Sequence, residues 1–125
     1  GYSMNQLFTI LITSIILFSC ASNVEEDLIV DVCVPEKISF SVDIYPILSD
    51  RCVNCHKSAN PQSGINYETY KDVLSTVVAG KPEQSLLYGT ISHTFGVAMP
   101  YLEDQISECE IEKIENWILD GAKND

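Results

Sequence analysis

The sequence predicts a small all-α domain, because two stretches carry helical periodicity and no strand pattern competes with them. Apolar residues recur at helical spacing early in the domain, at Ile44, Ile47 and Leu48. They recur again near its end, at Ile114 and Ile118. No sustained alternation of apolar and polar residues appears, and neither does an internal repeat. The expected fold is therefore a set of helices joined by loops.

The first helix is expected over residues 41–52, just before the cysteine pair that dominates the chemistry. Ser41 suits the N-cap position, and Asp43 suits the first turn, where the helix dipole favours a negative charge. Pro46 has no backbone N–H, so it must lie near the start of this helix or kink it. A polar loop over residues 57–64, rich in Ser, Asn, Pro and Gly, is expected to follow.

Three further helices are expected in the rest of the domain. Two short ones are predicted over residues 66–74 and 82–88, the second beginning with a Pro that suits the first helical position. The last helix has the clearest signals. Ser107 and Glu110 form a capping-box pattern at its start, and Gly121 suits the position just after its end.

The first nineteen residues differ in composition from everything that follows. Residues 1–19 contain no Asp, Glu, Lys or Arg, and residues 7–18 are almost wholly apolar. This run is too short to span a bilayer but suits the apolar region of an export signal. The segment before Cys20 resembles the lipobox of bacterial lipoproteins, in which that Cys becomes the lipidated first residue. The alternative is an ordinary signal or an uncleaved anchor in which Cys20 is incidental.

Removal of such a signal leaves one small domain behind an acidic tether. Residues 20–37 are predicted to form the lipidated Cys and the tether, and residues 38–125 the domain. All charged residues lie after the signal, so the exported chain keeps the formal net charge of −11. This acidity argues against a nucleic-acid partner and fits docking to a basic patch on another protein.

The five cysteines fall into three groups. Cys20 is assigned to the lipid, and Cys52 and Cys55 belong to a common motif. Cys33 and Cys109 remain, an even pair in a compartment where disulfides persist. We expect them to pair, with two free thiols as the alternative. Closing so long a loop gives about 4–5 kcal/mol in the loop-entropy model, as an upper estimate.

Residues 52–56 form a C-x-x-C-H motif that predicts one covalently attached haem c. Two thiols at this spacing can each add to one haem vinyl group and form a thioether. The adjoining His56 then lies under the macrocycle, with an imidazole nitrogen free to bind the iron. Half of a zinc site and a thioredoxin-type dithiol are the alternatives. The sequence offers neither a second ligand pair nor a βαβ pattern to support them.

The second axial ligand of the iron is expected to be Met99. It is the only methionine after the signal, and a flexible stretch precedes it. A thioether ligand raises the reduction potential relative to a second imidazole. His93, the only other histidine, is the alternative distal ligand, and an open distal site is a third possibility. Met99 as a core-filling side chain and His93 as a plain loop residue are the non-functional interpretations.

A wider set of residues resembles a known family. These residues are Phe40, Asp43, Pro46, Ile47, Leu48, Cys52, Cys55, His56, Gly80, Pro82, Ser85, Leu86, Leu87, Met99, Pro100, Trp117, Ile118, Gly121 and Ala122. Over about residues 38–123 they resemble the planctomycete-type cytochrome c family of small single-haem domains. The resemblance implies that the helix before the haem motif crosses the C-terminal helix. It also implies His56 and Met99 as axial ligands, although Lys57 stands where Gly is common.

The function expected from these features is single-electron transfer between membrane-associated redox partners, by a carrier and not an enzyme. The lipid anchor would raise the effective concentration of the haem near such partners. The expected location is outside the inner membrane, anchored by lipid, and at the outer membrane facing the periplasm or the cell surface. One alternative is a haem-based sensor or small-molecule-binding module from which Met99 dissociates. Another is a haem peroxidase that uses His93.

Overall fold

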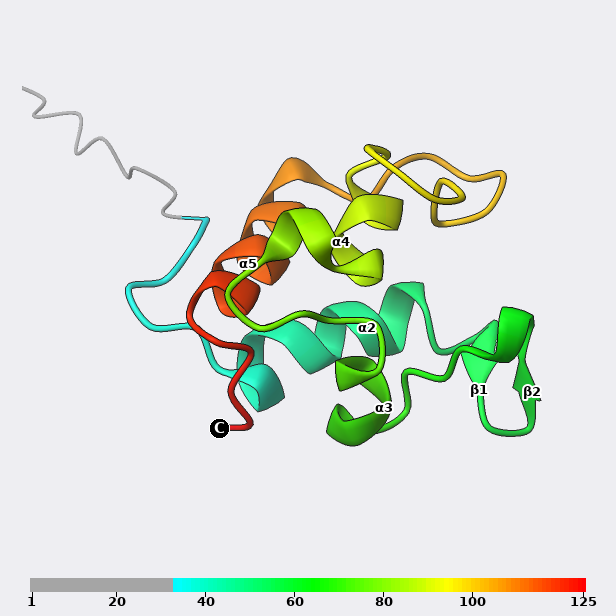
Figure 1. The fold of residues 1–125 in the computed structure, drawn as a ribbon, viewed down its shortest axis with the longest axis horizontal. Helices are drawn as coiled ribbons and strands as arrows, with labels where there is room; N and C mark the ends of the chain where they lie inside the picture. The colour runs from blue at the N-terminus through cyan, green and yellow to red at the C-terminus, as the bar shows by residue number, and fades with distance from the viewer. Residues whose placement is uncertain (1–32) are drawn as a thin grey trace, which may run out of the picture. The chain divides into compact units, whose positions relative to one another are not determined.

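The computed structural model describes residues 33–125, which form a mostly helical domain (Figure 1). The elements in chain order are η1 (Phe40–Ile44), α2 (Tyr45–Arg51), β1 (His56–Lys57), β2 (Asn60–Pro61), η2 (Gln62–Gly64), α3 (Tyr70–Leu74), η3 (Pro82–Gln84), α4 (Leu86–Ile91) and α5 (Glu108–Leu119). The predicted fold class is thereby confirmed, with one two-residue ladder added. The predicted signal peptide, Cys20 and residues 21–32 of the tether lie outside the described residues.

The first helical segment begins earlier than predicted and opens as a π-helix. Its N-cap is Ser39, where Ser41 was expected, and η1 runs directly into α2. Asp43 helps to cap this segment, because its carboxylate accepts the Ser39 N–H at 2.9 Å. Pro46 is the second residue of α2 and directly follows the π-helical turn, so the helix is irregular just before the residue that cannot donate a backbone hydrogen bond. The predicted acidic residue, Asp43, therefore lies in η1, and Pro46 lies at the start of α2 within the same continuous segment.

The first middle helix is shorter than predicted, and the second is divided and ends later than predicted, at Ile91, for local reasons. The helix expected over 66–74 begins only after Thr69, because the Asn66 side chain accepts the Glu68 N–H at 3.0 Å and holds a turn there. The helix expected over 82–88 is divided into η3 and α4 at Ser85, which has an extended backbone. The buried Ser85 hydroxyl accepts the Val78 N–H at 2.8 Å, which fixes this break.

The last helix follows its sequence signals closely. Ser107 is its N-cap, and the complete capping box with Glu110 is present. The helix ends at Leu119, and Gly121 follows the C-cap with a φ of +97°, a value that favours glycine. The boundaries of α5 were therefore encoded almost entirely in its own sequence.

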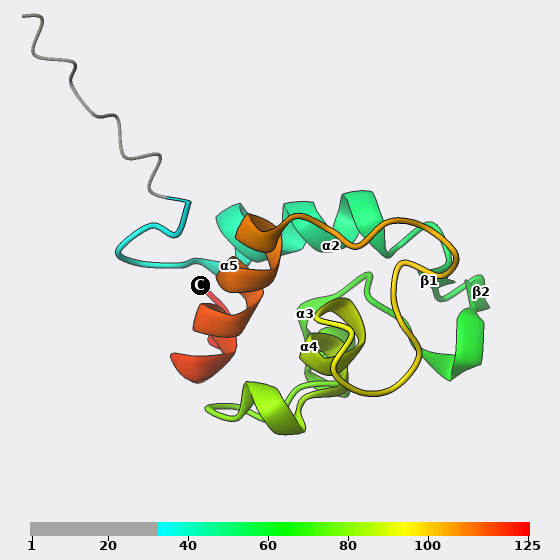
Figure 2. The ribbon, with the colours of Figure 1, turned by 90° about the horizontal axis from the view of Figure 1, so that it is seen from above.

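The helix before the cysteine motif packs against the last helix, as predicted. Ile44, Leu48, Ile114 and Ile118 are all buried in one core. Trp117 joins them, and its ring lies 5.4 Å from that of Phe40, centroid to centroid. Figures 1 and 2 show η1 and α2 on one side of the domain, with α5 against them. This packing fixes the end of α2, from which the cysteine motif extends. Within residues 33–125, no helix is both long and apolar enough to cross a membrane.

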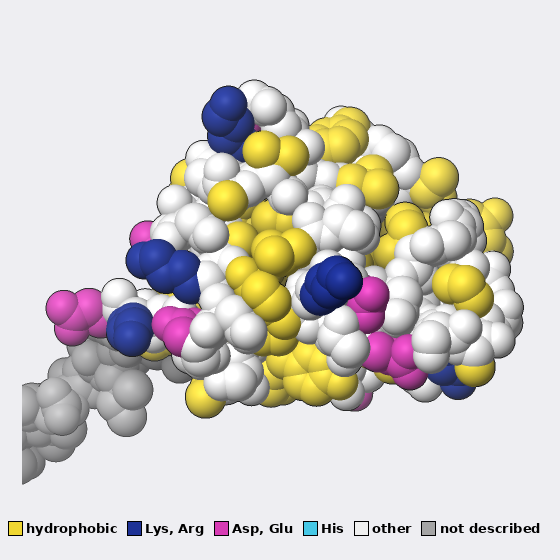
Figure 3. All heavy atoms as spheres, turned by 60° about the horizontal axis from the view of Figure 1, so that its bottom comes forward, with side chains coloured by type: hydrophobic (Ala, Val, Ile, Leu, Met, Phe, Trp, Pro, Cys, Tyr) yellow, Lys and Arg dark blue, Asp and Glu magenta, His cyan; other side chains and the backbone are white. Residues whose placement is uncertain are grey.

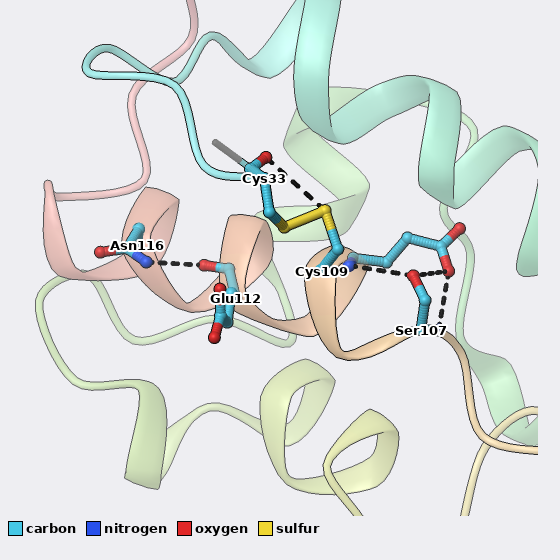
Figure 4. The surroundings of a disulfide bond; sticks show 6 residues. Cys33, Ser107, Cys109, Glu112 and Asn116 are labelled. Carbon is cyan, nitrogen blue, oxygen red and sulfur yellow. Dashed lines mark hydrogen bonds between the residues drawn. A yellow bond between two sulfur atoms is a disulfide. The ribbon is translucent and has the colours of Figure 1, made fainter. Parts of the chain in front are cut away.

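A disulfide joins Cys33 to Cys109 in the first turn of α5, close to Ser107 (Figure 4). The two Cα atoms lie 5.5 Å apart across 76 positions of sequence. Val34, beside the first of these cysteines, packs against the hydrophobic core. The bond therefore fastens the segment that enters the domain to the helix that closes its core.

Removing this bond should destabilise the domain substantially. We expect the Cys33→Ser/Cys109→Ser variant to lose about 2–4 kcal/mol of unfolding free energy, because the unfolded chain gains the entropy of a long loop. Denaturant unfolding of the holoprotein, compared with the wild type before and after reduction, measures the loss. Mass spectrometry of the wild type provides the control, as reduction of one bond adds two hydrogens. An unchanged unfolding midpoint in the variant would show that the bond contributes nothing.

Candidate functional site

The C-x-x-C-H motif forms a tight turn at the end of α2. Cys52 is the C-cap of the helix and donates its backbone N–H to the Leu48 carbonyl at 2.9 Å. The N–H groups of Cys55 and His56 both point back to the Cys52 carbonyl, at 3.2 and 2.9 Å. Cys52 is half-buried and Cys55 exposed, and they are the free cysteines of the described part of the chain. One turn thus presents two thiols and an imidazole together.

The Cys52 thiol is not prepared for thiolate chemistry. Burial raises its pKa to about 12, and the nearby Glu110 carboxylate adds to this effect. Dithiol oxidoreductases need the opposite shift, since the thiolate is the attacking species. The described residues also lack the βαβ unit of a thioredoxin-like fold. The surroundings of Cys52 therefore do not favour the dithiol interpretation.

The zinc interpretation also finds no support within residues 33–125. No group of three or more His, Cys, Asp or Glu side chains is placed there to hold a metal ion. A structural zinc site needs four such ligands at tetrahedral geometry. The motif accordingly stands as a pair of thiols beside one imidazole.

His56 is buried and held in one orientation. Its Nδ1 lies 3.3 Å from the Ile65 carbonyl oxygen, which can only accept a hydrogen bond. In a hydrogen bond to this carbonyl, Nδ1 is the donor, and the neutral tautomer that donates from Nδ1 has its lone pair on Nε2. A histidine that ligates a metal commonly donates its other ring N–H to a carbonyl in this way. His56 is therefore a candidate metal ligand through Nε2.

Tyr67 contacts His56 through both its ring and its backbone. Its ring meets that of His56 edge-on, with centroids 5.4 Å apart, and its backbone N–H donates to the His56 carbonyl at 2.9 Å. Burial raises the pKa of the phenol to about 12, so it is neutral at physiological pH. Tyr67 falls inside a helix that the sequence predicts, so this contact with His56 was not foreseen. An aromatic residue in a polar stretch was the only signal, and it was weak.

A small hairpin carries the chain from His56 back to Tyr67. β1 and β2 pair antiparallel, with His56 opposite Pro61, and η2 follows. Gly64 then turns the chain with a φ of +74°, a conformation that glycine adopts without strain. This turn replaces the plain loop expected over residues 57–64. It brings Ile65 and Tyr67 against the imidazole.

Met99 lies on the loop over residues 92–107, which joins α4 to α5 and is called the Met99 loop below. It is half-buried, and its N–H donates to the Thr90 carbonyl on α4 at 3.0 Å. Both ribbon views place the loop after α4 at the same end of the domain as the β1–β2 hairpin (Figures 1 and 2). The loop that carries Met99 and the hairpin that begins at His56 are therefore separate elements at the same end of the fold. His93, the alternative ligand, is exposed, and its Nε2 lies 3.1 Å from the Met99 carbonyl oxygen.

The residues at this end fit a haem. The two thiols have the spacing that thioether attachment needs, and Nε2 of His56 is the ring nitrogen that would bind the iron. Four large apolar side chains on the Met99 loop are exposed to 39%, 56%, 66% and 88%: Phe95, Val97, Tyr101 and Leu102. Grouped apolar exposure of this kind marks a ligand or partner surface. A large apolar macrocycle suits such a surface.

A separate open cavity of about 860 Å³ lies beside the motif. Its wall includes Arg51 and Pro100, the sequence neighbours of Cys52 and Met99, but neither Cys52 nor Met99. Most of the remaining wall comes from residues 102–107. Because neither the thiols nor the imidazole of His56 line this cavity, we do not assign the haem to it.

Glu110 connects this region to the start of α5. Its carboxylate accepts the Ser107 N–H at 2.8 Å and the Arg51 Nε–H at 3.3 Å. Burial raises the pKa of Glu110, but hydrogen bonds from Ser107 and the Arg51 charge outweigh burial and leave it below its ordinary value. One carboxylate thus caps α5 and holds the last residue before the motif.

Replacing Glu110 should destabilise the domain at neutral pH and have less effect in acid. We expect Glu110→Ala to cost about 1 kcal/mol of unfolding free energy through loss of the cap. A lowered pKa in the folded state adds stability above the unfolded pKa, and that stability is lost as pH falls through the folded pKa. Denaturant unfolding at neutral pH and at a pH below the folded-state pKa of Glu110 measures this loss of stability. Glu108→Ala, in the same turn without these bonds, is the matched control, and an equal loss in both variants would contradict the assignment.

Taken together, the fold and the site define a class. A small helical domain presents a C-x-x-C-H turn, an oriented imidazole and a methionine loop at one end, which is the arrangement of a c-type cytochrome. Residues 52–100 match the model of the family described as Planctomycete cytochrome C, and this match supports the planctomycete-type cytochrome c family for this chain. The matched segment begins at Cys52 and extends just past Met99. Neither curated proteins nor solved structures give a significant match.

Proposed function

We propose that this chain is a single-electron carrier with one haem c, attached through Cys52 and Cys55 and ligated by His56 and Met99. The observation that carries the proposal is the orientation of His56, whose Nδ1–H is held by the Ile65 carbonyl. This bond leaves Nε2 free beside two free thiols. The match to a cytochrome c family supports haem-based electron transfer in general.

Each residue at the site has a defined task in this proposal. When bound, a haem supplies an iron that takes up and releases one electron at a time. Cys52 and Cys55 hold the group covalently, so that a small domain keeps it without a large pocket. The Ile65 carbonyl and Tyr67 fix the imidazole, while Thr90 fixes the backbone of Met99.

His56 and Met99 would hold the iron of a bound haem. Because the imidazole of His56 and the backbone of Met99 are fixed by these hydrogen bonds, neither residue would have to move when the iron gains or loses an electron. Such a site favours transfer of electrons over binding or conversion of a substrate.

The partners we propose are redox proteins with a basic docking patch. The chain has a formal net charge of −11, which would steer a basic partner toward it. Glu103 and Asp104 directly follow the exposed Leu102, so acidic groups border the apolar loop. On the face drawn in Figure 3, by contrast, a band of apolar side chains has charged groups of both signs around it. The loop after α4 therefore suits a basic partner better than this face does.

We also propose that the chain is exported and anchored through a lipid on Cys20, at the outer membrane facing the periplasm or the cell surface. The support is the uncharged apolar run that precedes this cysteine. In a lipoprotein-processing host, wild-type protein should fractionate with membranes and Cys20→Ser protein should be soluble or remain unprocessed. Equal membrane association of both, with the same processing, would rule out the lipid.

The experiment that tests electron transfer is voltammetry of the intact haem-loaded protein. We expect one reversible one-electron wave and negligible binding of carbon monoxide to the reduced protein. A resting high-spin iron that binds carbon monoxide readily would contradict a simple carrier. That result would favour a sensor or a peroxidase.

A further inference from the structure

The loop that carries Met99 is fastened to a single turn of α4. At its start, the N–H groups of Thr94 and Phe95 donate to the Gly89 carbonyl, at 3.0 and 3.3 Å. Further along, the Met99 N–H donates to the Thr90 carbonyl at 3.0 Å. The segment from Thr94 to Met99 is therefore fastened at both ends to adjacent residues of one helix.

The ring of Phe95 closes the same region by packing over Gly89. A Cβ atom placed on Gly89 would lie only 2.2 Å from the Phe95 ring, so only glycine allows this approach. The ring and the two backbone bonds thus hold the loop at its start. They leave the carbonyl side of Met99 to be fixed by something else.

His93 supplies that contact. Its Nε2 lies 3.1 Å from the Met99 carbonyl oxygen, and a carbonyl can only accept, so Nε2 carries the proton and donates. His93 has a φ of +58°, the left-handed region that non-glycine residues rarely adopt. The unusual backbone conformation therefore occurs at the residue whose side chain reaches across the loop to Met99.

We propose that His93 is a positioning residue for Met99 and not an iron ligand. The peptide units on both sides of Met99 are then held, one by the Thr90 carbonyl and the other by His93 Nε2. Fixing the backbone on both sides limits the directions in which the thioether can point. The inference rests on the proposed function, since it takes Met99 as the axial ligand.

The test compares three variants of the haem-loaded protein. His93→Ala removes the donor, and His93→Gln retains an N–H donor on a side chain of similar reach. Thr94→Ala removes a hydroxyl in the same loop that contacts Ser92, 2.9 Å away, and not Met99. The readouts are the far-red ferric band of a thioether ligand, the reduction potential and the rate of carbon monoxide binding. The denaturation midpoint is measured alongside.

We expect His93→Ala to weaken the far-red band, lower the potential and speed carbon monoxide binding several-fold. His93→Gln should restore most of each value, and Thr94→Ala should match the wild type. If His93→Ala lowers only the denaturation midpoint, or if His93→Gln fails to restore the band, the proposal is overturned. A wild type that shows no far-red band would instead refute Met99 ligation, and with it the proposed function.

Discussion

The Cys52→Ala/Cys55→Ala variant should lose all covalently bound haem. Each thiol provides one thioether, so each single variant should retain one covalent bond and the double variant none. Neither cysteine is used by the Cys33–Cys109 disulfide, so both thiols are free to form a thioether, although Cys52 is half-buried and Cys55 exposed. Acid–acetone extraction of protein made in a host with c-type haem maturation measures the loss directly.

The matched control for this experiment is Asn54→Ala. Asn54 is exposed in the same turn, between the two cysteines, and its replacement leaves both thiols in place. Its haem should stay with the protein through extraction. Haem retained by the double variant at the level of the control would refute the motif as the attachment site.

The Met99→Ala variant should open the distal side of the iron. Loss of the thioether removes a ligand that stabilises the reduced state, so the reduction potential should fall. Axial ligands control potentials over a range of roughly 0.8 V, so a large shift is expected. The far-red ferric band should disappear and carbon monoxide should bind readily. Voltammetry and optical spectroscopy measure these changes on the same sample.

Thr94→Ala controls for general disturbance of the Met99 loop. Thr94 is exposed, and its hydroxyl lies 2.9 Å from that of Ser92 and does not contact Met99. This variant should keep the wild-type band and a potential close to that of the wild type. A Met99→Ala protein with the spectrum and potential of the wild type would exclude Met99 as the ligand.

The features predicted best from the sequence were those with strictly local causes. The capping box of Ser107 and Glu110 and the glycine after α5 depend on neighbouring residues alone, and the structure contains both. The packing of the first helical segment on the last was implied by the family resemblance, and the apolar stripe on each segment agreed with it. The stripes at Ile44 and Ile114 can be buried together only if the two helices meet.

The features that sequence reasoning missed depend on contacts that periodicity cannot show. Ser85 divides a predicted helix because its hydroxyl bonds to Val78, which is seven residues away in sequence. Asn66 delays α3 through a side-chain turn that competes with helix formation. The support of His56 by Tyr67 requires the chain to reverse at Gly64, and spacing alone does not reveal which residue then meets the imidazole.

The central claim is that one covalent haem is ligated by His56 and Met99, and an optical spectrum tests it most directly. Ferric and dithionite-reduced spectra should be recorded on protein made in a host with c-type haem maturation. We predict a narrow, low-spin reduced spectrum and a weak far-red band in the ferric state. Absence of haem would return the cysteine pair to the zinc or dithiol interpretations. A high-spin spectrum would contradict Met99 ligation and favour a sensor or a peroxidase.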